Sequence, residues 1–363
     1  MARQLDLGGC ERDVTKIAKG LDRSRFEPHV GCFRSHGLRW DELKQAGVPL
    51  VEFPLHSLGA PSSWRAWTQM ARYLRERDIR LVHAYDVPTD VYALPVAWMN
   101  ERIAISSQLS YRGLAVPRTR HLLRLTDQMV DRVVVNCLAM QRHLVEDERV
   151  PPSRIYLCYN GVDTAEFYPL PGPRPERLRD ASLVIGVVCA LRPEKSLPTL
   201  LEAFAMVRSL KAGVKLILVG SGPVQPELEA LSARLGLGED CLFEPATSNV
   251  PFWMRGIDIF VLPSISEAFS NSLLEAMACG CCPVGSRVGG TPELIEHGTR
   301  GLLFEPGNAA DLAHQLAFAM EREPRRKAMA AEAARFARER LSVEIAVGRM
   351  ETLYGSLIEA HGG

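Results

Sequence analysis

The chain has 363 residues, a length that predicts about two domains of ordinary size. Hydrophobic residues make up 47% of it and charged residues 24%, values that exclude disorder as the dominant state. Lysine and arginine total 43, as do aspartate and glutamate, which leaves a formal net charge of zero. The basic excess typical of nucleic-acid-binding proteins is missing, so we do not expect nucleic acid as a partner.

The apolar runs and the cysteines favour a cytoplasmic protein. No apolar run reaches the roughly 18 residues of a membrane span, and the first residues lack the hydrophobic segment of a secretory signal. The nine cysteines are odd in number and mostly scattered through apolar stretches, as is typical of reduced, buried thiols. Only Cys279, Cys281 and Cys282 cluster. Without further regularly spaced ligands nearby, they are better interpreted as core residues than as a metal site.

Short apolar runs alternate with amphipathic stretches along almost the whole chain. Strands are predicted at residues 29–33, 48–53, 80–84, 102–106, 132–135 and 155–158, and again at 183–189, 214–219, 257–262 and 282–285. Helices are predicted between them, including 11–21, 63–77, 118–129 and 138–145, then 197–210, 224–235, 272–279 and 310–320. This alternation is typical of an α/β fold whose parallel sheets are covered by helices on both faces.

The alternation stops at residues 168–180, which hold four prolines and no apolar periodicity. We therefore predict two doubly wound domains, residues 1–167 and 181–342, joined by this linker. The final helix, residues 343–363, has an apolar face and no strand after it, so we expect it to dock back across the cleft between the domains. Before Gly8 the first strand is only a short polar stretch, so it is either short or truncated at the chain start.

Acidic residues and helix-start amides lie together in the segment PSISEAFSNSLLEAMACGCCP, directly after a predicted strand. Glu267 lies in its loop and Glu275 on its expected helix. The amides at the start of that helix favour an anion or a polyhydroxyl ligand. The candidates for this contact are Phe269, Ser270 and Asn271. Taken alone, however, the two acids are better interpreted as solvated surface groups.

Two further segments favour a ligand-binding site over solvated surface acids. Gly220 and Gly222 form a glycine-rich turn at the end of a predicted strand, the edge where open α/β sheets bind ligands. Arg192 and Lys195 follow another strand and precede a helix, where the helix dipole disfavours cations unless an anion is bound. A guanidinium and an ammonium at that edge would neutralise a diphosphate.

Taken together in chain order, these motifs resemble the family-4 group of retaining glycosyltransferases with the GT-B fold. The matching stretches are residues 8–12 (GGCER), 82–84 (VHA), 160–163 (NGVD), 191–195 (LRPEK), 220–223 (GSGP), 267–275 (EAFSNSLLE) and 289–293 (GGTPE). The resemblance covers essentially the whole chain. It implies two Rossmann-like domains facing each other across a cleft, and a nucleotide-diphosphate sugar as co-substrate with no other cofactor.

The resemblance also implies roles for residues of the second domain. Arg192 and Lys195 would hold the diphosphate of the donor, and Glu275 would accept hydrogen bonds from its ribose hydroxyls. Glu267, with the amides of residues 269–271, would position the transferred sugar.

In the first domain, Gly8 and Gly9 would let the backbone approach the phosphate or the acceptor, and His83 would contact the donor sugar. The family often has a second histidine two positions later, where this chain has Tyr85. The alternative for His83 is an ordinary packed histidine at a strand end.

The expected chemistry follows from charge. Glycosyl transfer builds negative charge on the departing diphosphate, and fixed cations with helix-end amides stabilise that charge. No Asp-x-Asp motif is placed to hold a metal, so we expect Arg192 and Lys195 to replace one. The resemblance implies transfer of a hexose-type sugar with retained anomeric configuration to a glycan or lipid-linked acceptor, in surface polysaccharide synthesis. The alternatives are a small-molecule or sugar-phosphate acceptor, and a non-catalytic nucleotide-sugar binder or inactive truncated form.

A basic segment, residues 111–124, carries four arginines and no acid; they are Arg112, Arg118, Arg120 and Arg124. We interpret it as a solvated basic helix face. The alternative is peripheral contact with an anionic membrane surface or a lipid-diphosphate acceptor.

Overall fold

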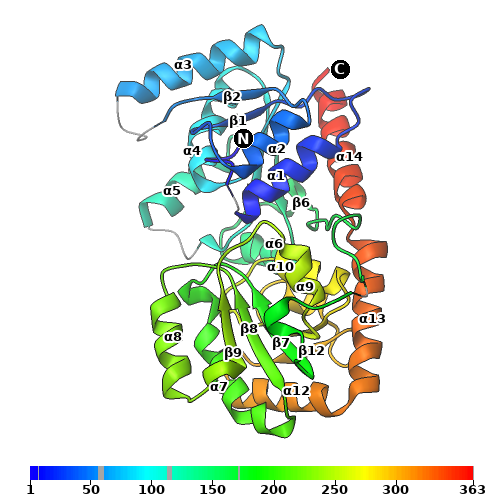
Figure 1. Ribbon diagram of the computed structural model, residues 1–363. Coiled ribbons are helices and arrows are strands. Elements are labelled where there is room, and N and C mark those ends of the chain that lie inside the picture. The colour runs from blue at the N-terminus through cyan, green and yellow to red at the C-terminus, as the bar shows by residue number, and fades with distance from the viewer. Residues whose placement is uncertain (7, 56–60, 113–116, 171, 363) are drawn as a thin grey trace. The chain divides into compact units, whose positions relative to one another are not determined.

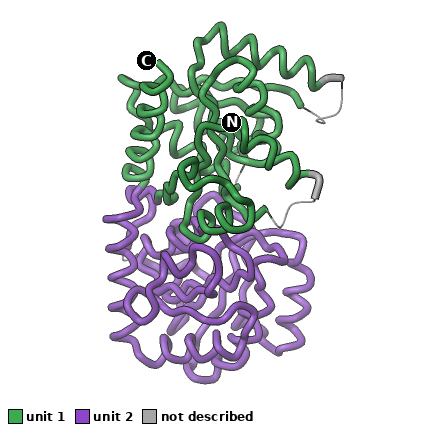
Figure 2. Tube along the Cα trace, turned by 180° about the vertical axis from the view of Figure 1, so that it is seen from behind, with its two compact units in different colours: residues 1–161, 343–363 green, residues 162–342 purple. Residues whose placement is uncertain are grey.

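The computed structural model describes the chain apart from residues 7, 56–60, 113–116, 171 and 363. The described residues form two compact units, with Met1–Gly161 and Val343–Gly363 in unit 1 and Val162–Ser342 in unit 2 (Figure 2). In both units the paired strands run parallel, and helices connect successive strands (Figure 1). The α/β class predicted from the sequence is therefore confirmed.

Unit 1 alternates helices and strands in chain order. Its elements are α1 (Gly9–Gly20), β1 (Val30–Cys32), α2 (Leu38–Gln45), β2 (Leu50–Glu52), α3 (Pro61–Glu76), β3 (Leu81–Ala84), α4 (Val87–Met99), β4 (Ile103–Gln108), α5 (Pro117–Thr126), β5 (Arg132–Val135), α6 (Leu138–Glu146), β6 (Ile155–Leu157) and α14 (Val343–Gly362). Strands β1 and β2 pair with each other, and β3 to β6 form a second sheet in sequence order.

The first three residues connect these two sheets. On one side the N–H of Ala2 donates to the carbonyl of Gly31, the middle residue of β1, at 3.1 Å. On the other side the carbonyl of Met1 accepts from the N–H of Tyr85 at 3.0 Å, and its amino group donates to the carbonyl of His83. The short polar stretch at the start of the chain thus lies between β1 and β3, where Ala2 forms an isolated bridge with Cys32.

The final helix, α14, packs in unit 1 beside α1 (Figure 1). Its apolar face contributes Val347, Tyr354 and Leu357 to a core that includes Ile17 of α1 and Ile105 of β4. The apolar face of α14, which no strand follows, is thus buried against α1 and the sheet of unit 1.

Unit 2 starts earlier than expected, because unit 1 ends at Gly161 rather than at residue 167. The N–H of Val162 donates to the carbonyl of Leu341 at 2.8 Å. Within the proline-rich segment, Arg174 donates to the carboxylate of Asp258 at 2.6 Å. The segment expected to be the interdomain linker is therefore part of unit 2.

The elements of unit 2 are β7 (Leu183–Val188), α7 (Leu197–Val207), β8 (Val214–Val219), α8 (Gln225–Arg234), β9 (Cys241–Glu244), α9 (Val250–Arg255), β10 (Ile259–Leu262), α10 (Asn271–Ala278), β11 (Cys282–Ser286), α11 (Thr291–Leu294), β12 (Leu302–Phe304), α12 (Ala309–Glu321) and α13 (Glu323–Arg340). Its six strands lie in the order β12-β11-β10-β7-β8-β9. The middle strands are buried on both faces, as expected of a sheet covered by helices on both sides.

Candidate functional site

The order in which the chain adds strands to the parallel sheet of unit 2 reverses at β7. From β7 the chain proceeds through β8 to β9 on one side, and β10, β11 and β12 then follow on the other side. Strands β7 and β10 are neighbours, so the loops that leave their carboxyl ends diverge. In open α/β sheets such a switch point forms a crevice that binds ligands.

The loop after β7 carries the two predicted cations. Pro193–Lys195 form a short 3-10 turn, and Ser196 follows in the left-handed conformation with φ of 48° before α7 begins. The side chain of Arg192 is exposed and makes no ion pair with any described residue. The Lys195 ammonium lies 2.5 Å from the Glu267 carboxylate, so two predicted site residues are in direct contact.

The loop after β10 holds Glu267 at this position. The hydroxyl of Ser264 donates to the same Glu267 oxygen at 3.3 Å, and the N–H of Ile265 donates to the carbonyl of Glu194 at 2.9 Å. The side chains of Lys195 and Glu267 are 18% and 14% exposed, so their ion pair is partly shielded from water. The two loops are therefore linked by both backbone and side-chain contacts.

Helix α10 begins at Asn271, as predicted, and its amino end lies in the same loop. The hydroxyl of Ser270 accepts from the N–H of Leu273 at 3.3 Å and caps the helix. The positive end of the helix dipole favours an anion there. Glu275 is only 1% exposed, so it is not the solvated surface acid that the sequence alone favoured.

The glycines of the turn after β8 let that loop approach the loop after β7. A β-carbon on Gly220 would lie 1.8 Å from the carbonyl oxygen of Cys189, and one on Gly222 would lie 2.1 Å from that of Leu191. Both distances are far below van der Waals contact, so only glycine fits at either position. The predicted site residues of unit 2 thus all lie at or next to the carboxyl ends of β7, β8 and β10. They are Arg192, Lys195, Gly220, Gly222, Glu267, Phe269, Ser270, Asn271 and Glu275.

Two residues that shape this site, Ser264 and Gly289, were not among the site residues predicted from the sequence. Ser264 positions Glu267, and its carbonyl accepts from the hydroxyl of Ser286 at 2.5 Å. Gly289 lies against the same loop, because a β-carbon there would be 1.6 Å from the carbonyl oxygen of Glu267. The sequence signal for Ser264 was its place in the polar loop after a buried strand. Gly289 entered only through the resemblance.

The predicted site residues of unit 1 lie in separate places: the glycines at the start of α1, and His83 in β3. Gly8 precedes α1, which begins at Gly9. His83 is buried, and its ring nitrogens bond to the hydroxyls of Tyr354 at 2.7 Å and Ser107 at 2.8 Å. Burial lowers the pKa of His83 well below its ordinary value, so the ring is neutral. With both nitrogens engaged, His83 has the geometry of the packed histidine, the alternative to a sugar contact.

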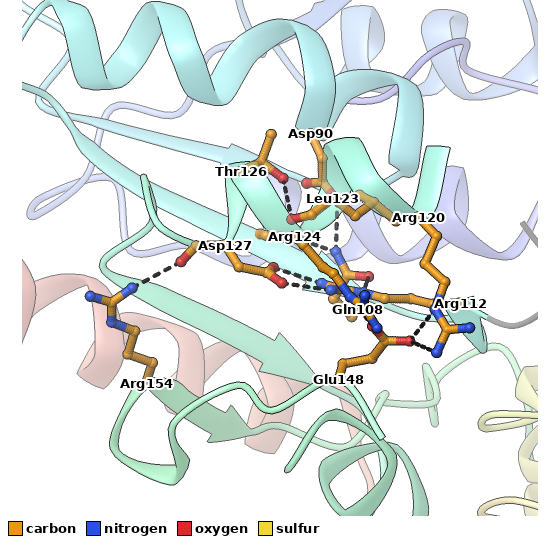
Figure 3. A network of polar contacts seen from close by, with 11 residues as sticks. Asp90, Gln108, Arg112, Arg120, Leu123, Arg124, Thr126, Asp127, Glu148 and Arg154 are labelled. Atoms are coloured by element: carbon orange, nitrogen blue, oxygen red, sulfur yellow. Dashed lines mark hydrogen bonds and ion pairs between the residues drawn. The ribbon is translucent and has the colours of Figure 1, made fainter. Parts of the chain in front are cut away.

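The basic segment is not a free cationic face (Figure 3). The Arg112 guanidinium is buried and donates to both oxygens of Asp127, at 2.6 and 2.7 Å, and to the side chain of Gln108 at 3.1 Å. The expectation of a solvated basic helix is wrong for this residue. The counter-charge is Asp127, which lies outside residues 111–124, so a count of the acids within that segment could not predict this ion pair.

Two further arginines of the segment share one acid. Arg120 and Arg124 donate to Glu148 at 2.7 and 3.0 Å, and the Glu148 side chain is fully buried (Figure 3). The side chain of Arg118 lies outside the described residues. In the part of the chain that the structure describes, no helix combines the length and apolar character needed to cross a membrane.

The clustered cysteines are buried thiols. Cys279, Cys281 and Cys282 are free and buried. Desolvation raises the pKa of Cys279 and Cys282 to about 12, so both are protonated at neutral pH. They lie between the end of α10 and the start of β11.

Two protein-family models match the chain in succession. Glycosyltransferase Family 4 matches residues 7–166, and Glycosyl transferases group 1 matches residues 173–336. The chain belongs to the family-4 glycosyltransferases, and its two Rossmann-like units are those of the GT-B fold.

The relatives of this chain include two differently named kinds of enzyme. N-acetyl-alpha-D-glucosaminyl L-malate synthase from Bacillus anthracis is 28% identical over 84% of this chain and 80% of its own length. D-inositol 3-phosphate glycosyltransferase from Thermomonospora curvata is 32% identical over 62% of this chain, which spans only 56% of that relative. Among solved structures, Anabaena HepE in complex with UDP superposes with a TM-score of 0.82 at 24% identity, covering 98% of both chains. At that identity the likeness shows the fold alone.

Proposed function

We propose that this glycosyltransferase takes a hexose-type sugar from a nucleotide-diphosphate donor, retains its anomeric configuration and uses no metal ion. The observation that carries the proposal is the cluster at the carboxyl ends of β7 and β10. The exposed Arg192 and the Lys195–Glu267 ion pair come from the loops after β7 and β10, and α10 starts at the end of the second of these loops, at the switch point. Cations in front of a helix amino end are best explained by an anion that binds between them.

In this proposal each group acts on the diphosphate or on the sugar. The fork of Arg192 binds two phosphate oxygens, and Lys195 uses a second of its three N–H donors for the phosphate while Glu267 holds the first. The bond between the sugar C1 and the diphosphate breaks, and its electron pair stays on the diphosphate. The two cations and the first turn of α10 stabilise that developing charge. The acceptor hydroxyl oxygen then bonds to C1, and its proton passes to the departing phosphate.

Two carboxylates complete the donor site. Glu267 accepts hydrogen bonds from hydroxyls of the transferred sugar, and Glu275 accepts those of the ribose. Glu275 lies on the second turn of α10, so the nucleoside would lie along the start of that helix, with the phosphates at its amino end. Because Glu275 is buried, a pair of ribose hydroxyls offers it donors that exclude water.

For the acceptor, the named relatives favour a small hydroxylated anion. One relative makes a glucosaminyl malate, and others transfer sugar to an inositol phosphate. We therefore propose a small anionic acceptor, with a glycan or lipid-linked acceptor as the second candidate. Initial rates with malate, inositol 3-phosphate and a lipid-linked glycan, measured with the same donor, decide between them.

The donor site is tested by a matched pair of lysine variants. Lys195 and Lys215 both pair with an acid in unit 2, but Lys215 starts from the amino end of β8, away from the site. In a thermal-shift panel of UDP-, GDP- and ADP-sugars, the ligand that fits raises Tm by mass action. We expect Lys195→Met to lose that shift and Lys215→Met to keep it. Equal shifts in both variants would place the donor elsewhere.

The stereochemistry is tested separately. The anomeric proton coupling of the product, followed by NMR from the first turnover, reports whether the configuration of the donor is kept. An inverted product rejects the retaining reaction even if the lysine variants behave as expected.

A further inference from the structure

Helix α4 presents only apolar and aromatic side chains to solvent. Its single charged residue, Asp90, is fully buried. The residues of α4 that are not buried are Val87, Pro88, Val91, Pro95, Trp98 and Met99. Positions 88, 91, 95, 98 and 99 recur every three or four residues, so they share one face of the helix. A surface helix normally turns polar side chains to water, so this apolar stripe indicates a partner.

The carboxyl end of this stripe is its most exposed part. Trp98 and Met99 are 59% and 65% exposed, although both are large apolar side chains. Single exposed hydrophobic residues are common on protein surfaces, but here two adjacent ones continue a stripe that runs the length of the helix.

The two neighbouring helices extend the apolar surface. Helices α3 and α5 both pack against α4 (Figure 1), and right-handed crossovers place all three on one side of the strands. On α3, Trp64 is 70% exposed, and its ring contacts that of Trp67 edge to face at 5.8 Å between centroids. On α5, Leu122 and Leu125 are exposed. We call the solvent side of these three helices the α3–α5 face.

The helices on either side of α4 carry cations. Arg65 and Arg72 of α3 are exposed and make no ion pair with any described residue. On α5, Arg120 and Arg124 share the one carboxylate of Glu148, so this group keeps a net positive charge. An uncharged stripe is thus bordered by positive charge on both sides.

Acids are sparse on the same face. Among the exposed residues that the structure describes in the three helices, the acid is Glu76, the last residue of α3. The loops that follow α3 and α4, residues 77–80 and 100–102, together hold three arginines and two acids. The partner that complements this face therefore offers both anionic groups and an apolar layer.

A lipid surface meets both requirements better than a second copy of the chain. In a two-fold dimer the same patch meets itself, which would bring the cations of one copy against those of the other. An anionic bilayer offers phosphate groups to the arginines and acyl chains to the apolar stripe.

We propose that the α3–α5 face of unit 1 binds the surface of an anionic lipid bilayer. Helix α4 lies in the plane of the interface, with Trp98 and Met99 at the boundary between headgroups and acyl chains. Trp64 lies at the headgroup level, where indole rings are favoured, and Arg65 and Arg72 bind lipid phosphates. With 13 residues, α4 is about 20 Å long, too short to cross the hydrocarbon core. The proposal concerns unit 1 and does not depend on the donor site in unit 2.

The test measures flotation of the full chain with lipid vesicles. Vesicles of phosphatidylcholine are compared with vesicles in which about a third of the lipid is phosphatidylglycerol, and we expect binding to the second kind, weakened by salt. Trp98→Gln combined with Met99→Gln should lower the partition coefficient about tenfold, because two apolar side chains lose their burial in lipid. The matched control, Met206→Gln combined with Leu210→Gln, changes two exposed apolar side chains of unit 2 and should bind like the wild type.

A second double variant separates charge from apolar burial. Arg65→Gln combined with Arg72→Gln should lower binding to the anionic vesicles about tenfold and leave the interaction with phosphatidylcholine vesicles unchanged. Both double variants of unit 1 replace exposed side chains, so each should keep the Tm of the wild type.

Three outcomes overturn the proposal. The chain fails to float with the anionic vesicles, or the control variant of unit 2 loses as much binding as the variant of α4. In the third outcome, sedimentation shows a dimer that Trp98→Gln combined with Met99→Gln converts to a monomer, which would make the α3–α5 face an interface between copies.

Discussion

The two basic segments of the molecule differ in where their counter-charges lie. Arg112, Arg120 and Arg124 in unit 1 each reach a carboxylate of their own unit within 3.0 Å. Arg192 in unit 2 is exposed and has no ion pair with a described residue, while the neighbouring Lys195 pairs with Glu267. In sequence both segments are cations near a helix start. Among the arginines of the two segments whose side chains the structure describes, only Arg192 makes no ion pair and stays available to a ligand.

This difference shows that the count of charges within a segment is a poor guide to its function. The acids that pair with the described arginines of the first segment lie outside it: Asp127 follows α5, and Glu148 follows α6 (Figure 3). A paired arginine stabilises the fold, whereas an unpaired one beside a helix amino end suits an anion. The predictions below separate these two roles.

The largest expected effect is the loss of the buried ion pair in unit 1. Asp127→Ala leaves the Arg112 guanidinium, whose side chain is 1% exposed, without its bidentate partner. We expect the free energy of unfolding to fall by about 3–5 kcal/mol, as for other broken buried pairs, measured by urea denaturation. The double variant Arg112→Met, Asp127→Leu should regain most of that loss. A change below about 1 kcal/mol in the single variant would show that the pair is not structural.

The next effect concerns the exposed arginine of unit 2. Arg192→Met should lower kcat/KM by about 10²–10³, the usual cost of removing one charge-stabilising contact in a transition state. Its Tm should not change, because no packing contact is lost. Arg124→Met, another partly exposed arginine, is the matched control and should keep kcat/KM. The comparison between the segments fails if both variants lose activity to the same extent.

Periodicity predicted the elements that have a buried face and enough length. Strand β8 was predicted to the residue, and α10 was predicted within a residue of its start. The strands β9 and β12 were missed, and both are short edge strands of the sheet. Helix α4 was not among the predicted helices, because it is apolar all round and has no 3.6-residue pattern to detect.

For the site, the sequence predicted which loops lie at the same edge of the sheet, but not which side chains form pairs there. The loops after β7, β8 and β10 follow from βαβ winding, which places Arg192, Gly220 and Glu267 at one edge. The Lys195–Glu267 contact depends on side-chain packing between loops that are 72 residues apart in the chain. The two hydroxyls that engage His83 likewise come from β4 and α14, and no local pattern indicates them.

A smaller effect is expected from Glu148 and depends on pH. Burial raises the pKa of this carboxyl, but the hydrogen bonds and charges of Arg120 and Arg124 outweigh burial and leave the pKa below its ordinary value. The stabilisation is therefore complete above the unfolded-state pKa and is lost as the pH falls through the folded-state value. Because the arginines are 38% and 50% exposed and their charges are screened, we expect about 1 kcal/mol.

Its measurement compares the wild type with Glu148→Gln by urea denaturation at pH 7 and pH 3. The wild type should be the more stable protein at pH 7, and the gap should narrow at pH 3, as the pH falls toward the lowered folded-state pKa of the carboxyl. A gap of equal size at both pH values would mean that packing, not charge, accounts for the effect of this residue.

The smallest expected effect is that of a metal chelator on the reaction. If Arg192, Lys195 and the start of α10 stabilise the departing diphosphate, its charge is already balanced by the protein. Initial rates after dialysis against EDTA should then stay within about twofold of the untreated rate, with the metal content of the dialysed enzyme checked by mass spectrometry. A strict requirement for Mg²⁺ would assign the leaving-group charge to the metal ion. It would also leave the Arg192 guanidinium without its proposed role, although the absence of an ion pair with any described residue would still distinguish it from the paired arginines of unit 1.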